Sequence, residues 1–425
     1  MAKAREPALA LTIERLGARG DGIAFMDGTP VFVAGALPRE RVHAVITGER
    51  GHGFAARLEA ILYEQGRAAP ACQHFGVCGG CVAQHMDQPT YADWRRTTVV
   101  DALTRARLAV PEASDGPVLT PPGARRRVRL HFTRRGGLGY RKRASHAVLT
   151  PQACPLIRPE LDALLRPLAT CLQALPLAAT GLDVALTSTR SGVDLLLIGG
   201  RAPGLSDRET LSAFADAQDL ARIAWAAKPA QVPEPIVMRR SPVVDVGGIR
   251  VGLPPGAFLQ ASLEAEQALR ARVHDALAGR TRVLDLFTGI GTFALPLARA
   301  GHRVTAYERD ASLIDALNGA ARLHGLNDRV SGHVRDLERA PLHKDELAAC
   351  DAVLLDPPRA GAGPMCQMLA ASGPPLVVMV SCHVGSFARD GATLAESGYR
   401  LTGLSIVDAF LWSDQLELVA VFERA

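Results

Sequence analysis

The 425-residue chain is too long for one ordinary hydrophobic core, so its length predicts two or three domains. Apolar residues make up 48% of it, which predicts a packed globular protein, and the net charge of only +5 requires any nucleic-acid contact to come from a local patch. No apolar stretch reaches the roughly 18 residues of a membrane helix, and charges interrupt the N-terminus before a signal-peptide core can form. We therefore expect a cytoplasmic protein without membrane contact.

The pattern of apolar residues changes twice along the chain. Residues 1–62 predict a small OB-like β-barrel, because short alternating strands over 9–13, 23–33 and 42–46 are separated by glycine-rich turns. Residues 63–254 are expected to form a central α+β domain, whose helix near 90–110 we place against the C-terminal domain. Over 255–425 strands alternate with helical segments, which predicts a Rossmann-like, doubly wound sheet. The expected fold class is α/β.

Eight cysteines in a cytoplasmic chain favour metal binding or catalysis over structural disulfides. Cys72, Cys78 and Cys81 are closely spaced, and Cys154 follows them in a Cys-Pro pair. Four thiolates can enclose zinc or a 4Fe-4S cluster, and the unequal spacing favours iron–sulfur. A radical S-adenosylmethionine enzyme would use three cysteines and leave one iron of the cluster unligated for the cofactor. The four candidate cysteines here therefore indicate a closed, non-catalytic cluster. Four unrelated buried cysteines are the alternative.

A glycine loop follows an apolar strand that ends at Leu286. Gly289 and Gly291 let a ligand approach the backbone, and Glu308, at the end of the next strand, can bind both ribose hydroxyls of a nucleoside. A complete dinucleotide fingerprint would have a third glycine where this chain has Ala294. The loop therefore favours S-adenosylmethionine over a nicotinamide cofactor.

A basic segment spans 125–143, with nine Lys and Arg residues and no Asp or Glu. Val128 and Leu130 alternate with Arg127 and Arg129, so a strand here would bury one face and present a basic one. A solvated sheet face, the alternative, would normally carry mixed charges. With Arg141 nearby, the segment predicts a surface for RNA phosphates.

Cys382 follows the apolar run 376–380, at the predicted end of a strand. A small buried residue is one interpretation, since free cysteine is often buried. In an open α/β sheet, however, ligands bind at the carboxyl ends of the strands, where Asp356 also lies. Arg359 stands where methyltransferases acting on exocyclic amines have an aromatic residue. Carbon 5 of uracil requires prior addition of a thiolate at carbon 6, and Cys382 is placed to be that nucleophile.

Taken together, these motifs resemble the RNA (uracil-5-)-methyltransferase family over essentially the whole chain. The resemblance is to the iron–sulfur branch that methylates 23S ribosomal RNA and has an N-terminal TRAM barrel. It rests on the cysteines 72, 78, 81 and 154, “FLQ” at 258–260, “DLFTGIGTF”, Glu308, “LDPPRAG”, “VSC” and “LWSDQLELV”.

The resemblance implies roles for individual residues. Asp356 would bind the edge of the uracil, Cys382 would add to carbon 6, and Glu417 would remove the proton from carbon 5. Without the resemblance, the alternation around Glu417 favours a surface carboxylate. The methyl-donor pocket would be lined by Gln260, Phe287, Gly289, Gly291, Glu308, Asp336 and Asp356.

The sequence departs from the family after the nucleophile, where His383 and Val384 replace the usual Asn-Pro. It also has Leu411 where a proline is usual, and Gln415 where the family has the histidine of its His-x-Glu motif. None of these changes removes a catalytic group. They bear on the geometry of the loops and on the choice of RNA.

We therefore expect an enzyme that methylates carbon 5 of a uridine in 23S ribosomal RNA, with S-adenosylmethionine and a 4Fe-4S cluster as cofactors and no obligate protein partner. One alternative is the T-loop uridine of transfer RNA. Another is an iron–sulfur RNA-binding protein that has lost catalysis, which the altered residues after Cys382 would explain. Retention of Glu308, Asp356, Cys382 and Glu417 argues against that second alternative.

Overall fold

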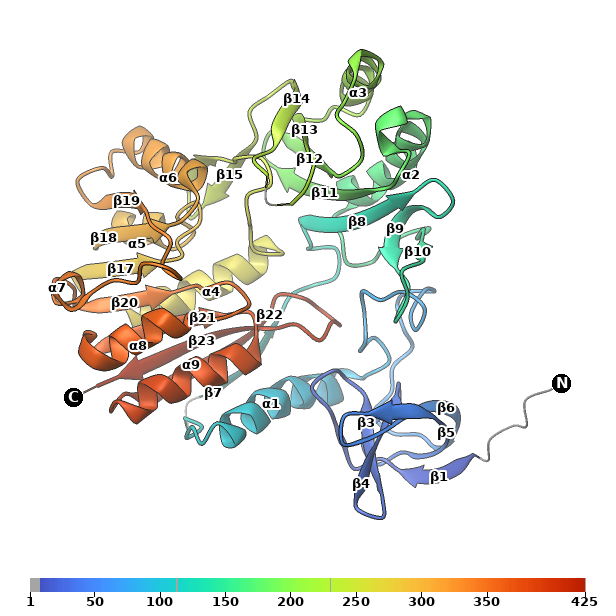
Figure 1. Ribbon diagram of the computed structural model, residues 1–425. Coiled ribbons are helices and arrows are strands. Elements are labelled where there is room, and N and C mark those ends of the chain that lie inside the picture. The colour runs from blue at the N-terminus through green and yellow to red at the C-terminus, as the bar shows by residue number, and fades with distance from the viewer. Residues whose placement is uncertain (1–7, 112–113, 230, 425) are drawn as a thin grey trace. The chain divides into compact units, whose positions relative to one another are not determined.

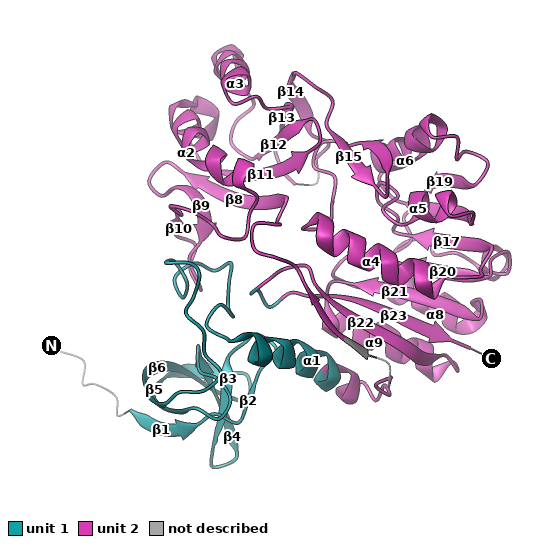
Figure 2. Cartoon of the chain, turned by 180° about the vertical axis from the view of Figure 1, so that it is seen from behind, with its two compact units in different colours: residues 1–101, 412–414 teal, residues 102–411, 415–425 magenta. Residues whose placement is uncertain are grey.

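The computed structural model describes residues 8–111, 114–229 and 231–424, which belong to two compact units. Unit 1 comprises residues 1–101 with 412–414, and unit 2 comprises 102–411 with 415–425 (Figure 2). The domain boundaries placed after residues 62 and 254 remain predictions. Among the described residues, no helix is long and apolar enough to cross a membrane.

Unit 1 is built on a six-stranded sheet in the order β1-β5-β6-β4-β3-β2. The predicted short strands are all present, and their alternating apolar residues, among them Val31, Val33, Val42 and Ala44, form a core of their own. Whether the sheet is an OB barrel stays a prediction. The strands are β1 (Leu9–Thr12), β2 (Arg15–Leu16), β3 (Gly22–Met26), β4 (Thr29–Ala34), β5 (Arg41–Arg50) and β6 (Gly53–Tyr63), and the helix predicted near 90–110 is α1 (Gln88–Arg105).

The first part of unit 2 is a seven-stranded sheet in the order β10-β9-β8-β11-β12-β13-β14. Its core combines the inward residues of β8, β11 and β12 with the apolar face of helix α2. The strands are β8 (Arg127–Thr133), β9 (Gly137–Arg141), β10 (Val148–Leu149), β11 (Leu182–Thr189), β12 (Gly192–Ile198), β13 (Arg222–Ala226) and β14 (Glu234–Met238), with α2 (Pro159–Ala174), a 3-10 turn (Pro176–Ala178) and α3 (Leu205–Ala217).

The second part of unit 2 contains a hairpin, β15 (Val243–Val246) and β16 (Ile249–Gly252), and an eight-stranded sheet in the order β19-β18-β17-β20-β21-β23-β22-β7. The strands of this sheet are β7 (Ser114–Leu119), β17 (Arg282–Leu286), β18 (Arg303–Glu308), β19 (Val330–Val334), β20 (Ala352–Leu355), β21 (Leu376–Ser381), β22 (Arg400–Asp408) and β23 (Glu417–Glu423). The helices are α4 (Leu263–Ala276), α5 (Ala294–Arg299), α6 (Ala311–Leu323), α7 (Lys344–Leu347), α8 (Gly363–Ser372) and α9 (Val384–Glu396).

Strands β17 to β21 are parallel, while β23 runs antiparallel to its two neighbours β21 and β22. Helices α8 and α9 face the viewer in Figure 1, and α4 covers the other face of the sheet, seen in Figure 2. Every residue of β21 is buried, as expected for a strand covered on both faces. The predicted doubly wound sheet is therefore present, and the carboxyl ends of its parallel strands share one edge.

Candidate active site at the carboxyl edge of the eight-stranded sheet

The loop after β17 has an unusual backbone. Gly289 and Gly291 have φ angles of 57° and 88°, and Phe287, which is not a glycine, also has a positive φ of 65°. A side chain at Gly289 would meet nothing within 4 Å, so this position faces open space. Positive φ at a non-glycine residue is strained and is typical of functional loops. The backbone here is therefore exposed to an incoming ligand.

Glu308, the last residue of β18, is bonded to this loop. Its Oε2 accepts the Gly289 N–H at 3.3 Å, and its Oε1 accepts the N–H groups of Arg309 and Asp310 at 2.8 and 3.1 Å. Because β17 and β18 pair in parallel, with Leu286 opposite Tyr307, the loop and the carboxylate lie at the same edge. The predicted pair of glycine loop and acid is thus brought together.

Two buried polar side chains, one in β17 and one just before α4, have an oxygen without a partner among the described residues. They are Asp285, through Oδ1, and Gln260, through Oε1. The other carboxylate oxygen of Asp285 accepts the Thr288 hydroxyl at 2.7 Å. Burial, and to a smaller extent the nearby Glu308, raise the pKa of Asp285 to about 7, against the lowering effect of its hydrogen bonds. Buried acceptors without partners are expected where a polar ligand binds.

Asp336, another residue of the predicted donor pocket, follows β19. Its Oδ1 accepts the backbone N–H groups of Glu338 and Arg339 at 3.1 and 3.3 Å. The side chain is about one-third exposed, at 35%. Its place after the strand next to β18 puts it on the same edge as Glu308.

The pairing of three neighbouring strands explains why Cys382, Glu417 and Asp356 lie close together. In the antiparallel pair β21–β23, Ser381 lies opposite Leu418, so the next position along brings Cys382 opposite Glu417. Asp356 comes directly after β20, the parallel neighbour of β21. The topology therefore gathers a thiol and two carboxyl groups from positions up to 61 residues apart (417 − 356) at one edge.

The electrostatics of this group favour its neutral form. Glu417 is 1% exposed, so the surface carboxylate favoured by the alternation alone is wrong. Burial, and then the nearby Asp356, raise the pKa of Glu417 well above its usual value. Burial raises the pKa of Asp356 to about 7, with Asp285 and Glu308 adding to the shift. Burial also raises the pKa of the Cys382 thiol to about 11, and Glu417 and Asp356 contribute.

Sequence reasoning missed two contacts that support this edge. Arg126 donates through Nε to the backbone oxygen of Gln260 at 3.1 Å and is paired with the buried Glu266 of α4. His383 is the N-cap of α9, directly after Cys382. The departure at His383 from the family pattern was a signal for the second contact. Arg126 was not singled out because it is one of nine Lys and Arg residues in the basic segment.

The basic segment forms β8 and β9, and its predicted alternation is confirmed by buried Val128, Leu130 and Phe132. Its charge is less uniform than the sequence indicated. Arg129 donates to Asp183 of β11 at 2.7 Å, and His131 lies 2.6 Å from the same carboxylate.

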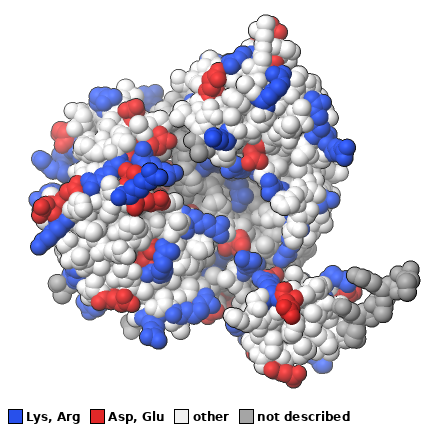
Figure 3. Space-filling model, in the orientation of Figure 1, with Lys and Arg blue, Asp and Glu red and all other residues white. Residues whose placement is uncertain are grey.

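Arg127 differs from Arg129 because it lies over the Phe258 ring, at 5.3 Å from the centroid. Burial, and then Arg129, lower the pKa of Arg127. Arg141 is exposed and lies 3.5 Å from His146. Figure 3 shows Lys and Arg interspersed with Asp and Glu over the visible face of the molecule, without one continuous basic patch. Any RNA surface on this segment therefore depends on individual arginines.

The four spaced cysteines are divided between the units: Cys72, Cys78 and Cys81 belong to unit 1 and Cys154 to unit 2. None of the four forms a disulfide in the described chain, and all are of intermediate exposure. Cys78 Sγ accepts the Gly80 N–H at 3.4 Å, a contact that suits a thiolate ligand. Within the described ranges, no group of three or more His, Cys, Asp or Glu side chains is gathered to hold a metal. The donor chemistry fits a cluster, whereas the described chain does not show the ligands assembled.

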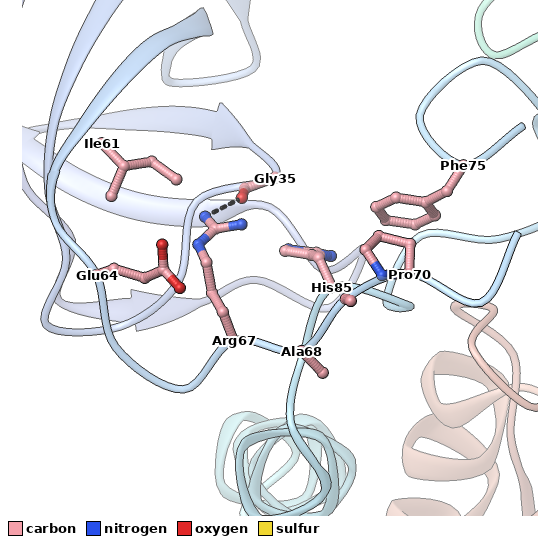
Figure 4. Close-up of a pocket in the computed structure, with 9 residues that line it drawn as sticks. Gly35, Ile61, Glu64, Arg67, Ala68, Pro70, Phe75 and His85 are labelled. Atoms are coloured by element: carbon pink, nitrogen blue, oxygen red, sulfur yellow. Dashed lines mark hydrogen bonds between the residues drawn. The ribbon is translucent and has the colours of Figure 1, made fainter. Parts of the chain in front are cut away.

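The loop over residues 72–81, which carries three of the cysteines, borders a pocket of about 530 Å³ through Phe75 (Figure 4). Arg67 in its wall donates to the Gly35 oxygen at 2.7 Å and to Glu40 at 2.5 and 2.8 Å, so its guanidinium is fixed. The rings of Phe75 and His85, which also line this pocket, lie 5.3 Å apart. The segment that carries the three closely spaced cysteines is therefore packed on the remainder of unit 1.

Comparison with known proteins gives the family. No family model matches the chain. An RNA methyltransferase from Caulobacter vibrioides is 39% identical, over 97% of this chain and 99% of its own length. A 23S rRNA (uracil(1939)-C(5))-methyltransferase from Edwardsiella ictaluri is 34% identical, over 98% of this chain and 96% of its own. The chain belongs to the RNA (uracil-5-)-methyltransferase family.

A solved structure extends this family assignment to the fold. The tRNA (uracil-54, C5)-methyltransferase of Pyrococcus abyssi, in complex with S-adenosyl-L-homocysteine, is similar with a TM-score of 0.76. The similarity covers 97% of this chain and 99% of that protein at 19% sequence identity. At that identity the likeness concerns the fold, which the two proteins share over nearly all of both chains.

Proposed function

We propose that this enzyme transfers a methyl group from S-adenosylmethionine to carbon 5 of a uridine in 23S ribosomal RNA, through a covalent adduct with Cys382. The observation that carries the proposal is the register of β21 and β23, which brings Cys382, directly after β21, next to Glu417, with Asp356 directly after the neighbouring β20. A nucleophile and a base at one strand end are what addition to carbon 6 and removal of the carbon 5 proton require.

The loop after β17 and its neighbours would hold the methyl donor. Glu308 has both carboxylate oxygens fixed by backbone N–H groups, and its remaining lone pairs suit the ribose hydroxyls. The buried Gln260 Oε1, which has no partner among the described residues, suits a donor group of the ligand. Phe287, Gly289, Gly291 and Asp336 would complete the pocket, and the bound donor supplies the electrophilic methyl group.

In the proposed reaction, the Cys382 thiol first loses its proton to solvent water, and its sulfur bonds to carbon 6 of uracil. The electron pair of the 5,6 double bond moves to form an enolate, and carbon 5 then takes the methyl group from the sulfonium. Glu417 removes the proton from carbon 5, the double bond re-forms, and the bond between carbon 6 and sulfur breaks. Asp356 orients the base by bonding to its edge. Burial makes Glu417, once ionised, a stronger base than an exposed carboxylate.

We also propose that Cys72, Cys78, Cys81 and Cys154 ligate a 4Fe-4S cluster with a structural role. None of the four is in a disulfide in the described part of the chain, and the Gly80 N–H bonded to Cys78 Sγ supports a thiolate there. Metal binding is coupled to the ordering of its ligands, so the cluster would assemble these thiols as it binds. No step of the methyl transfer is assigned to it. RNA binding is assigned to Arg127 and Arg141, with a smaller share for the ion-paired Arg129.

Methylation in vitro tests the proposal. The purified enzyme is incubated with S-adenosylmethionine and transcripts of 23S ribosomal RNA or transfer RNA, and the nucleosides are analysed by mass spectrometry. We expect 5-methyluridine in the ribosomal transcript alone. Product in the transfer RNA instead would change the substrate, and binding of RNA without any product would support the non-catalytic alternative.

A further inference from the structure

His383 stands between the nucleophile and helix α9 and has no part in the reaction as proposed. β21 ends at Ser381, and only Cys382 and His383 separate it from the first residue of α9. The position of the thiol is therefore set by the strand on one side and by the helix N-terminus on the other. Whatever fixes the first turn of α9 also fixes Cys382.

The first turn of α9 is held by the imidazole of His383. Nδ1 accepts the Ser386 backbone N–H at 3.1 Å, which satisfies one of the N–H groups that a helix leaves free at its start. Histidine is not among the usual N-cap residues, which are Ser, Thr, Asp and Asn. An asparagine Oδ1 stands the same number of bonds from the backbone as Nδ1, so His383 offers an acceptor where asparagine would.

The same turn is tied to the loop after Asp356. The Ser386 hydroxyl lies 3.0 Å from the Arg359 backbone oxygen, and Arg389 donates to the Ala360 oxygen at 2.7 Å. The cap therefore stabilises a turn that contacts both segments of the proposed site. One segment carries Cys382, and the other follows Asp356.

The cap requires a neutral ring with its proton on Nε2, because a protonated Nδ1 would face the Ser386 N–H as a second donor. The surroundings favour neutrality. The groups that face the ring are Arg359, from the loop after β20, and Arg389, from α9, whose guanidinium also bonds Asp390. Burial and these two arginines lower the pKa of His383, and the positive end of α9 acts in the same direction. Gly385 leaves space for the ring, since a Cβ there would lie 3.0 Å from His383 Cε1.

We propose that His383 is a positioning residue, whose neutral imidazole caps α9 and thereby aligns Cys382 and the loop after Asp356, and whose protonation in acid releases this alignment. The proposal rests on the proposed function for its effect on rate. The cap itself does not depend on that function.

The test compares three substitutions across pH. His383→Asn keeps an acceptor at the same position but does not titrate, His383→Gln moves the acceptor one bond further, and His383→Ala removes it. At about pH 8 we expect His383→Asn to keep kcat within about two-fold, and His383→Gln and His383→Ala to lose about five-fold, the size of a lost N-cap. As the pH falls through the lowered pKa of His383, kcat of the wild type should fall relative to His383→Asn. The ratio of the two cancels the titration of groups that both proteins share.

Amide hydrogen exchange of residues 384–388 gives a readout that needs no substrate. Exchange should be slow in the wild type and in His383→Asn at about pH 8, and faster in His383→Ala, after correction for the intrinsic effect of pH. Parallel pH profiles of the wild type and His383→Asn, or unchanged exchange in His383→Ala, would overturn the proposal. If no RNA is methylated, the proposed function fails, and the exchange data still decide whether His383 caps the helix.

Discussion

Cys382 and the four spaced cysteines differ in how the fold fixes their positions. Cys382 lies at a strand end, and the register of β21 and β23 brings it opposite Glu417 within one sheet. Cys72, Cys78 and Cys81 lie on one loop of unit 1, while Cys154 belongs to unit 2. A site made of neighbouring strand ends is fixed by the topology of its sheet. The four spaced cysteines share no sheet, so no strand register fixes them as it fixes Cys382 and Glu417.

Replacing the proposed base is expected to have a large effect and to separate the steps at the strand end. Glu417→Gln cannot accept the carbon 5 proton, so turnover should fall by about 10²–10⁴-fold. Addition and methyl transfer should continue, and a methylated adduct with ordinary uridine RNA should accumulate. Mass spectrometry of the denatured protein measures it. Full turnover in Glu417→Gln would assign the proton to another base.

Removal of one of the four spaced cysteines tests the proposed iron–sulfur cluster. Cys78→Ser should lose most of the about four irons per chain expected after anaerobic purification, and its melting temperature should fall by about 5 °C or more, because ligation stabilises the fold. Metal analysis and thermal unfolding measure both. Cys171→Ala is the matched control, since Cys171 is a free cysteine outside both sites, and it should keep iron and activity. One equivalent of zinc without iron in the wild type would contradict the iron–sulfur assignment.

The reactivity of Cys382 with iodoacetamide should report its surroundings. The pKa of this thiol is raised to about 11 from an ordinary 9.0, so little thiolate exists near neutral pH, and alkylation should rise only in strong base. Burial is the larger cause, and Glu417 is the next. Glu417→Gln should therefore lower the alkylation midpoint yet leave it above the ordinary value. Peptide mass spectrometry distinguishes Cys382 from the other cysteines, and a midpoint near neutrality would contradict this account.

The smallest expected effects concern the basic segment. Arg127→Ala should weaken RNA binding several-fold and reduce the slope of log K against log salt by about 0.7–0.9 if its contact is a phosphate. Arg129→Ala should do less, because Asp183 already pairs with Arg129. Titrations at several salt concentrations measure both, with binding of the methyl donor as the control. Equal losses for the two variants would mean that the ion pair with Asp183 opens when RNA binds.

Most of the candidate residues at the strand ends could be identified from the sequence alone. Long apolar runs identified β17, β18, β20 and β21, and the residues that follow these strands, among them Glu308, Asp356 and Cys382, meet at one edge because parallel strands share their carboxyl ends. This part of the site follows from the order of local elements.

Features that depend on partners distant in sequence were not predicted from the pattern. Glu417 alternates like a surface residue, but it is buried because β23 is an interior strand of the sheet. Asp183, from β11, neutralises part of a segment that reads as purely basic. His383 read as a departure from the family pattern, whereas its ring accepts the N–H of Ser386.

The covalent adduct with 5-fluorouridine RNA tests the central claim most directly. Fluorine at carbon 5 cannot leave as a cation, so addition and methyl transfer should occur and elimination should stop. Incubation of the wild type with S-adenosylmethionine and 5-fluorouridine-substituted 23S RNA should give an adduct that survives denaturation and maps to Cys382. Cys382→Ala should form no adduct and no 5-methyluridine. An adduct on another residue, or methylation by Cys382→Ala near the wild-type rate, would contradict the assignment of Cys382 as the nucleophile.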